Sequence, residues 1–260
     1  MKKEHRAELI DNKSMNSDSS LLVFRCPEIA EESRPGQFVN VSCSKFLKRP
    51  FGVNDTDSIN GTFSIGVREV GEGSAEIRSL EPGALVDVLG PLGNYFPLEN
   101  AKKLIMVGGG TGVYPLHFAL KEARKANVQT IYICGFRCVS DSCLVDECEA
   151  FSDRFMITSD TGDVGIRGTV MDALYRLNEN EYNDATVLSV GPEIMMKNVS
   201  QWAENIGLDC FVSLERRMAC GIGMCLVCTC KIKTKNHDDL YENKRCCADG
   251  PIFNSREVVW

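Results

Sequence analysis

The chain has 260 residues, 43% of them hydrophobic and 25% charged, which suits a folded protein with one large domain or two to three small ones. Lys and Arg total 29 against 36 for Asp and Glu, so the net charge is −7 and no nucleic-acid-binding surface is expected. The longest uncharged run, residues 104–120, is broken by glycines and a proline, and the N-terminus lacks an apolar signal core, so we expect a cytoplasmic protein without a membrane span.

The first 100 residues have the pattern of a β domain. Short apolar or alternating runs are separated by turn residues, among them Pro82-Gly83 and Gly90-Pro91. The runs cover residues 7–10, 21–26, 38–43, 62–68 and 85–89. Short strands at this spacing are typical of a small barrel or sandwich. We predict an N-terminal antiparallel β-barrel over residues 1–100.

Two segments of this β domain contain residues that could bind a phosphate. Residues 49–53 read Arg-Pro-Phe-Gly-Val, and residues 70–74 read Val-Gly-Glu-Gly-Ser. An arginine can pair with a phosphate, and a Gly-Ser loop can donate N–H and hydroxyl hydrogen bonds to it. Ordinary turns of a β domain explain both segments equally well, so the residues alone leave the choice open.

From Lys102 onward, predicted strands alternate with predicted helices. The strands cover residues 104–107, 129–134, 155–158 and 185–190, and the helices cover 115–126, 143–150, 170–176 and 194–206. This alternation indicates a parallel sheet that is covered on both faces. Residues 101–209 are therefore predicted to form a central α/β nucleotide-binding domain.

A glycine-rich turn follows the first strand of that domain. It consists of Gly108, Gly109, Gly110, Thr111 and Gly112. A turn between a strand and a helix can present backbone N–H groups to a dinucleotide pyrophosphate. A valine stands at the third glycine position of the usual fingerprint, which weakens this signal. A second turn, Gly191-Pro192, also follows a strand, so both turns are expected at the carboxyl edge of the sheet.

Cysteine is the unusual component of the chain, with 13 residues. Disulfides are not expected in a reducing compartment, and free cysteines often pack as small hydrophobic residues. Six cysteines, however, fall in the last 41 residues: Cys220, Cys225, Cys228, Cys230, Cys246 and Cys247. This density indicates a metal site, so residues 210–260 are predicted to form a small C-terminal metal-binding domain.

The spacing of the first three of these cysteines is C-x4-C-x2-C, formed by Cys220, Cys225 and Cys228. With a distant fourth cysteine, this is the plant-type pattern for a 2Fe–2S cluster, and the two glycines inside the loop allow the sharp turns that it needs. The fourth ligand is either Cys246 or Cys247, and spacing does not choose between them. A structural zinc site is the alternative, although zinc more usually binds paired C-x2-C motifs.

Together these motifs resemble the ferredoxin-reductase-type flavoproteins. Residues 35–39 resemble their barrel signature, residues 49–52 their R-P-x-S motif, and Gly73-Ser74 the pair at the FAD pyrophosphate. The resemblance implies that FAD is bound by Arg49, Pro50, Phe51, Gly52, Gly66, Val67, Arg68, Gly73 and Ser74. It implies that NAD is bound by Gly108, Gly109, Gly110, Thr111, Gly112, Gly191 and Pro192.

The C-terminal part is more specific. Residues 213–225 and 247–253 are similar to the electron-transfer subunit of dihydroorotate dehydrogenase type B, and the resemblance extends over about residues 5–260. Its register implies that the cluster ligands are Cys220, Cys225, Cys228 and Cys247. Two positions depart from the family pattern, because Gly52 replaces a serine and Val190 replaces a cysteine.

This resemblance implies a function in pyrimidine (UMP) biosynthesis. Electrons would pass from the FMN of a catalytic dihydroorotate dehydrogenase subunit through the 2Fe–2S cluster and FAD to NAD+, in a heterotetramer with two copies of each subunit. The cofactors carry such chemistry, so no catalytic acid, base or nucleophile is assigned. Two alternatives are an electron-transfer subunit of another NAD(P)-linked oxidoreductase or hydrogenase, and a non-catalytic iron–sulfur binding protein.

Overall fold

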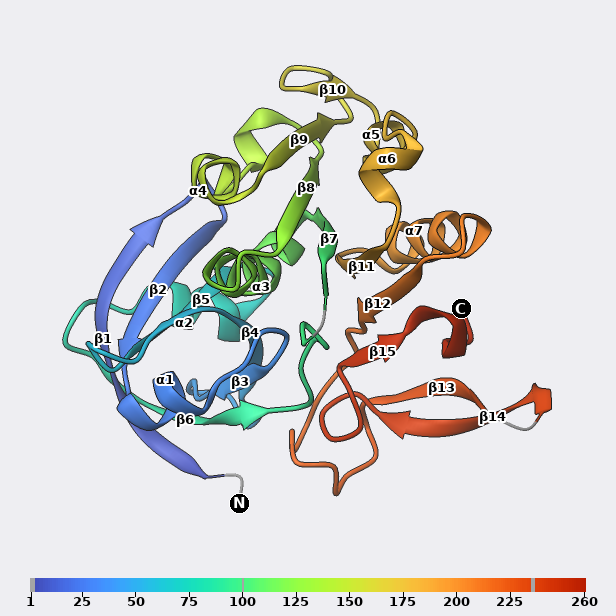
Figure 1. The fold of residues 1–260 in the computed structure, drawn as a ribbon. Coiled ribbons are helices and arrows are strands. Elements are labelled where there is room, and N and C mark those ends of the chain that lie inside the picture. Colours follow the sequence, from blue (N-terminus) through green and yellow to red (C-terminus); the bar gives the residue numbers. More distant parts are fainter. Residues whose placement is uncertain (1–2, 100, 235–236) are drawn as a thin grey trace.

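A closed six-stranded barrel forms the N-terminal part of the molecule (Figure 1). The computed structural model describes residues 3–99, 101–234 and 237–260. The strands follow the order β1-β2-β5-β4-β3-β6, and every neighbouring pair is antiparallel. Their bounds are β1 Glu4–Ser14, β2 Ser19–Arg25, β3 Phe38–Val41, β4 Arg49–Asp57, β5 Thr62–Arg68 and β6 Leu85–Leu92. The predicted antiparallel barrel is confirmed.

Alternating side chains fill the barrel. Leu22 and Phe24 of β2 and Phe63 and Ile65 of β5 are buried inside, as the period of a half-buried strand requires. Two short helices, α1 (Pro27–Glu32) and α2 (Glu72–Arg78), connect the strands. The sequence analysis did not predict β4, because proline and glycine at its start are poor strand formers. Pro50 is tolerated there because it lies at the beginning of the strand.

A seven-stranded sheet forms the centre of the molecule, in the order β10-β9-β8-β7-β11-β12-β15. All neighbouring pairs are parallel except β12 and β15. The strands are β7 Lys103–Gly109, β8 Gln129–Phe136, β9 Arg154–Ser159, β10 Ile166–Arg167, β11 Ala185–Val190, β12 Asp209–Ser213 and β15 Ile252–Asn254. The predicted parallel-sheet α/β architecture is confirmed.

Helices cover both faces of this sheet. Leu104 and Met106 of β7 belong to the core cluster on the side of α3 and α4, whereas Ile105 and Val107 belong to the cluster on the side of α5 and α7. Helix α3 also lies between the sheet and the barrel (Figure 1). The helices are α3 Val113–Lys125, α4 Val145–Phe151, α5 Val170–Leu174, α6 Glu179–Tyr182 and α7 Glu193–Asn205, and 3-10 turns cover Gly110–Gly112, Val139–Asp141 and Ser255–Glu257. Across the described ranges, every helix is too short or too polar to serve as a bilayer span.

The cysteine-rich segment is held at both ends by the central sheet. Strand β12 leads into it, and β15 returns from it to pair antiparallel with β12. The sheet therefore extends past residue 209. Between these strands lies the hairpin of β13 (Thr229–Thr234) and β14 (His237–Arg245). Because both ends are strands of one sheet, the position of the cysteines relative to the nucleotide-binding edge is determined by strand pairing.

Candidate functional site

A cavity of about 350 Å³, here called the junction cavity, lies where the barrel, α3 and the cysteine-rich segment meet. The barrel contributes Pro50, Phe51, Gly52, Gly66 and Arg68. The glycine turn and α3 contribute Thr111, Tyr114 and Pro115, and the end of β12 contributes residues 213–216. Most residues of the predicted FAD set that belong to β4 and β5 therefore face one common space.

Two glycines allow α3 to approach the barrel at this cavity. A Cβ atom on Gly66 would lie 2.1 Å from the ring of Tyr114, and one on Gly52 would lie 3.0 Å from the Cβ of Pro115. A side chain at Gly66 would therefore displace α3. At Gly52, where the family pattern has serine, Pro115 would have to move by a few tenths of an ångström to admit a side chain.

The remaining predicted FAD residues lie outside the junction cavity. The guanidinium of Arg49 lies against Gly73, where a Cβ atom would be only 2.5 Å from its Nε. The hydroxyl of Ser74 accepts hydrogen bonds from the N–H groups of Val70 and Gly71 at 2.9 and 3.1 Å, so it shapes the loop before α2. The side chain of Val67 is fully buried in the barrel core, which leaves only its backbone to meet a ligand.

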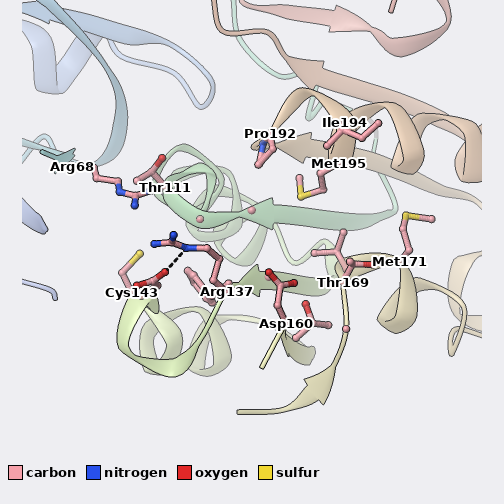
Figure 2. Close-up of a pocket in the computed structure, with 18 of the residues that line it drawn as sticks. Arg68, Thr111, Arg137, Cys143, Asp160, Thr169, Met171, Pro192, Ile194 and Met195 are labelled. Atoms are coloured by element: carbon pink, nitrogen blue, oxygen red, sulfur yellow. Dashed lines mark hydrogen bonds and ion pairs between the residues drawn. The ribbon is translucent and has the colours of Figure 1, made fainter. Parts of the chain in front are cut away.

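A second cavity of about 420 Å³, here called the nucleotide cavity, opens at the carboxyl edge of the central sheet. Gly109, Gly110 and Thr111 of the first glycine turn line it. Figure 2 shows Pro192 and Met195 on one side of this cavity and Arg137 and Asp160 on the other. Arg68 lines both cavities, so the two spaces adjoin at the barrel.

The two predicted glycine turns contact each other, as expected for neighbouring strands. Gly108 pairs with Val190 in the sheet, and a Cβ atom on Gly112 would lie 2.1 Å from the carbonyl oxygen of Val190. A Cβ atom on Gly191 would lie 3.0 Å from the Cα of Gly109. Glycine is therefore needed at Gly112 and Gly191, where the two turns pack against each other, and the side chain of Met195 packs against Gly109 and Gly191.

At the outer end of the nucleotide cavity, Arg137 follows β8, and its Nε donates to Asp141 Oδ2 at 2.8 Å. This is the position at which an NADP 2′-phosphate would need a free cation. Because the guanidinium already has a carboxylate partner, the local charge is compensated.

The predicted cluster ligands are brought together by the loop after β12. The Sγ atoms of Cys228 and Cys247 are 3.2 Å apart, although the two residues are 19 positions apart in the sequence. Burial opposes ionisation of Cys220, but hydrogen bonds from the N–H groups of Ile222 and Cys225 outweigh it and lower the pKa of the Cys220 thiol to about 6. Thiolates with N–H donors are the ligand form that iron–sulfur clusters need.

The two other cysteines of this segment form a separate pair. The thiol of Cys230 donates to the carbonyl of Lys244 at 3.6 Å, and a hydrogen bond with Cys230 together with burial raises the pKa of Cys246. Cys246 is fully buried. The two candidates for the fourth ligand therefore have different side-chain partners. Cys247 contacts the predicted ligand Cys228, whereas Cys246 contacts Cys230, which is not a predicted ligand.

The cysteine loop has the positive φ angles that its glycines permit, +70° at Gly221 and +86° at Gly223. It presses on the barrel, because a Cβ atom on Gly221 would lie 2.1 Å from the Nδ2 of Asn40 in β3. Arg245 ties the loop from the other side by donating to the carbonyl of Gly223 at 3.0 Å and to Asp249 at 2.8 Å. The loop is therefore held between the barrel and the end of the chain.

Sequence reasoning missed several residues that line the junction cavity, among them Tyr114 and Glu215. The ring of Tyr114 packs directly against Gly66, where a side chain would collide with it. This contact depends on how α3 packs on the barrel, so the sequence pattern did not predict it. Glu215 follows the last residues of β12, and its carboxyl group is the only one that lines the cavity among the described residues. The only indication in the sequence was its position, because Glu215 lies five residues before Cys220, the first predicted cluster ligand.

Comparison with known proteins adds family information to this geometry. Residues 215–259 match the model of the iron–sulfur cluster binding domain of dihydroorotate dehydrogenase B, and residues 6–96 match the oxidoreductase FAD-binding domain. The dihydroorotate dehydrogenase B (NAD(+)) electron transfer subunit of Caldanaerobacter subterraneus is 32% identical over the full length of both chains. The subunit of the same name from Clostridium perfringens is 37% identical over 86% of each chain.

Solved structures give the same fold. The structure of an NADH-dependent reduced ferredoxin–NADP oxidoreductase, studied for flavin-based electron bifurcation, superposes with a TM-score of 0.86 at 32% identity, covering 98% of this chain and 90% of that one. A ferredoxin reductase of carbazole 1,9a-dioxygenase superposes with a TM-score of 0.69 at 17% identity, covering 80% and 67% of the two chains. The second likeness concerns the fold alone.

Proposed function

Since this chain belongs to the family of electron-transfer subunits of dihydroorotate dehydrogenase B (NAD(+)), we propose that it carries electrons from a catalytic dihydroorotate dehydrogenase subunit to NAD+. Its cofactors are FAD and a 2Fe–2S cluster, and its electron donor is the FMN of the partner subunit. The process belongs to pyrimidine biosynthesis in the cytoplasm, and the assembly contains two copies of each subunit. Dihydroorotate itself is oxidised on the partner.

The junction cavity is the observation that carries this proposal. Its walls come from the barrel, from the glycine-turn helix and from the segment that leads into the cluster loop. A group bound there would contact Met218, two residues before Cys220, and would adjoin the nucleotide cavity at Arg68 and Thr111. When bound, FAD takes electrons one at a time and releases a hydride, which is the chemistry needed between a one-electron cluster and NAD+.

The barrel residues have distinct tasks in holding FAD. Arg49 supplies the positive charge for the phosphates beside the Gly73 loop, where the glycine leaves room for both the guanidinium and a ligand. The start of β4, with Gly52, and β5 at Gly66 and Arg68 would form one wall of the flavin site. Arg68 is held by Asp18 at 2.8 Å and lies where the junction cavity and the nucleotide cavity adjoin.

The cluster is held by Cys220, Cys225, Cys228 and Cys247, and the contact of Cys247 with Cys228 supports this choice of fourth ligand. NAD is held by the backbone of the two glycine turns, residues 108–112 and 191–192, which pack against each other at Gly112 and Gly191 too closely for a side chain there. The paired charge of Arg137 favours NAD over NADP.

Co-expression with an FMN-type dihydroorotate dehydrogenase from the same source tests the partner. We expect the two chains to co-purify in equal amounts and to reduce NAD+ when dihydroorotate is added. The isolated chain is expected to oxidise NADH with an artificial acceptor and to leave dihydroorotate unchanged. Dihydroorotate turnover by the isolated chain would overturn the proposal.

The FAD assignment has its own test. Arg49→Ala removes a charge-assisted contact with a phosphate, which is worth about 1.5–3 kcal/mol, or about 10- to 150-fold in affinity for FAD. Titration of the FAD-free protein, followed by flavin fluorescence, measures this change, and Lys45→Ala provides an exposed-cation control near the same loop. Unchanged FAD affinity in Arg49→Ala would remove Arg49 from the site.

A second candidate partner follows from the solved structure at 32% identity, which matches 98% of this chain. In that case the chain is an electron-transfer subunit of a bifurcating ferredoxin–NADP oxidoreductase. Reduced ferredoxin, instead of dihydroorotate, is then required for the reaction of the complex with the nicotinamide nucleotides. A complex purified from the source organism and assayed with both donors distinguishes the two partners.

A further inference from the structure

Glu215 places an unpaired carboxyl group in the junction cavity. It follows β12 directly after Leu214, it lines the junction cavity, and the residue is exposed to solvent. Among residues 3–99, 101–234 and 237–260, no hydrogen bond or ion pair reaches this carboxyl group. Partial desolvation by the surrounding protein raises the pKa of Glu215 above the usual value for glutamate.

The charged and titratable groups around Glu215 are committed elsewhere. Arg216 donates to Glu193 of α7 at 2.8 Å and to the backbone carbonyl of Glu215 at 2.9 Å. Arg68 of β5 is paired with Asp18 at 2.8 Å. Tyr114 of α3 is buried, which raises its pKa far above neutral, so it keeps its proton. Arg217, on the same segment, is exposed, and within the described ranges no cation forms an ion pair with the carboxyl group of Glu215.

The proposed function requires a proton at this place. The cluster supplies electrons only, one at a time, whereas NAD+ accepts a hydride, which is two electrons and one proton. One proton must therefore enter the junction cavity for every two electrons that leave as a hydride. The other polar side chains of the cavity are hydroxyls and arginines, which do not exchange protons near neutral pH.

We propose that Glu215 delivers this proton to the flavin nitrogen from which the hydride later leaves. Its O–H bond breaks as the electrons arrive, the carboxylate remains, and water at its accessible side returns a proton before the next cycle. The inference rests on the proposed function, because it assumes that electrons enter through the cluster. Its raised pKa keeps the carboxyl group supplied with a proton closer to neutral pH than an ordinary glutamate.

Glu215→Gln in the complete complex tests this role, because glutamine keeps the size and polarity but carries no exchangeable acid. Positioned proton transfer typically contributes 10²–10⁴-fold, so we expect a loss of about 10²-fold in the rate of dihydroorotate-driven NADH formation. We expect the wild-type rate to fall as the pH rises through the pKa of Glu215, and Glu215→Gln to lack this decline. Glu215→Asp should restore part of the rate together with the pH dependence.

A spectroscopic measurement separates proton transfer from a structural effect. The reduced-minus-oxidised infrared difference spectrum of the wild-type protein should contain a carboxylic acid C=O band that Glu215→Gln lacks. FAD content and cluster absorbance should be unchanged. Glu204→Gln, which removes an exposed carboxylate on α7 outside both cavities, should keep the band and the rate.

The outcomes are distinct. A wild-type complex that forms no NADH would refute the proposed function itself. If the wild type is active, then equal rates and equal infrared spectra for wild type and Glu215→Gln would refute the role of Glu215 alone. A Glu215→Gln protein that has lost FAD would also count against it, because the residue would then be needed for binding.

Discussion

The protein contains two groups of clustered cysteines, and their chemistry differs. In the nucleotide domain, burial raises the pKa of Cys134 and brings the pKa of Cys143 to about 11 and that of Cys148 to about 12, so these thiols stay protonated. In the cysteine-rich segment, backbone N–H groups lower the pKa of Cys220 to about 6 against the effect of burial, whereas burial and the hydrogen bond with Cys228 raise the pKa of Cys247 to about 12 in the absence of a metal. The number of nearby cysteines therefore does not decide whether a metal can bind.

The difference arises from the backbone. Cys134 lies within β8, and Cys148 lies in α4 with its N–H bonded to Leu144, so the local N–H groups serve the sheet and the helix. Cys220 lies in a loop whose N–H groups are not used by secondary structure, and the N–H of Ile222 donates to its sulfur at 3.5 Å. A site for thiolates needs irregular backbone, which glycines at positive φ provide.

The largest expected effect separates the two adjacent cysteines of the segment. Cys247→Ser should abolish the cluster, with loss of about two iron atoms per chain, because a plant-type cluster needs four cysteine ligands. Cys246→Ser is the matched control and should retain iron and visible absorbance. The reverse result would assign the fourth ligand to Cys246.

The second prediction concerns Cys143, which lines the nucleotide cavity. Its pKa is raised to about 11, so the reactive thiolate is scarce below that pH and increases as the pH rises. Alkylation by iodoacetamide in the intact protein should be about 10²-fold slower at pH 7 than that of a model thiol. The rate should still rise about tenfold per pH unit above pH 9, where the model thiol levels off; a plateau near pH 9 would contradict the assignment.

The third prediction concerns the buried group as a packing element. Cys134→Ser places a hydroxyl in an apolar environment and should lower the free energy of unfolding by about 1–2 kcal/mol. Iron content should not change, since Cys134 lies in the nucleotide domain. Denaturant unfolding and iron analysis measure the two effects. If Cys134→Ser lost iron but kept its free energy of unfolding, the prediction would be wrong, because Cys134 would then affect the cluster site and not the packing of the nucleotide domain.

The smallest expected effect concerns the ion pair beside the cluster loop. Arg245 holds the carboxylate of Asp249 at 2.8 Å and lowers the pKa of Asp249 to about 2, so the pair is present above about pH 4 and is lost as the pH falls toward 2. Asp249→Asn should speed the release of iron to a chelator several-fold at neutral pH. The same change at Asp209, which pairs with Arg256 away from the loop, should leave the rate unchanged.

Local patterns were sufficient for much of the fold and for the chemical types of the sites. The strands of the barrel and the alternating strands and helices of the sheet follow from apolar periodicity and turn residues, which act over a few positions. The three-cysteine loop and the glycine turns are likewise short motifs. Strand β4 escaped prediction because its first residues, including Pro50, disfavour a strand locally, and pairing with β3 and β5 outweighs that preference.

Contacts between distant residues were decided only in the folded chain. Spacing left Cys246 and Cys247 equivalent. In the folded chain both residues lie next to Cys228, but only the side chains distinguish them: the Sγ of Cys247 is 3.2 Å from that of Cys228, whereas Cys246 bonds the Cys228 carbonyl through its backbone N–H and pairs its thiol with Cys230. The junction cavity exists because Tyr114 packs over Gly66 and because β15 returns to β12, which brings Glu215 to the barrel. Such contacts join segments that are tens of residues apart, and their energy depends on shape and burial that no local pattern contains.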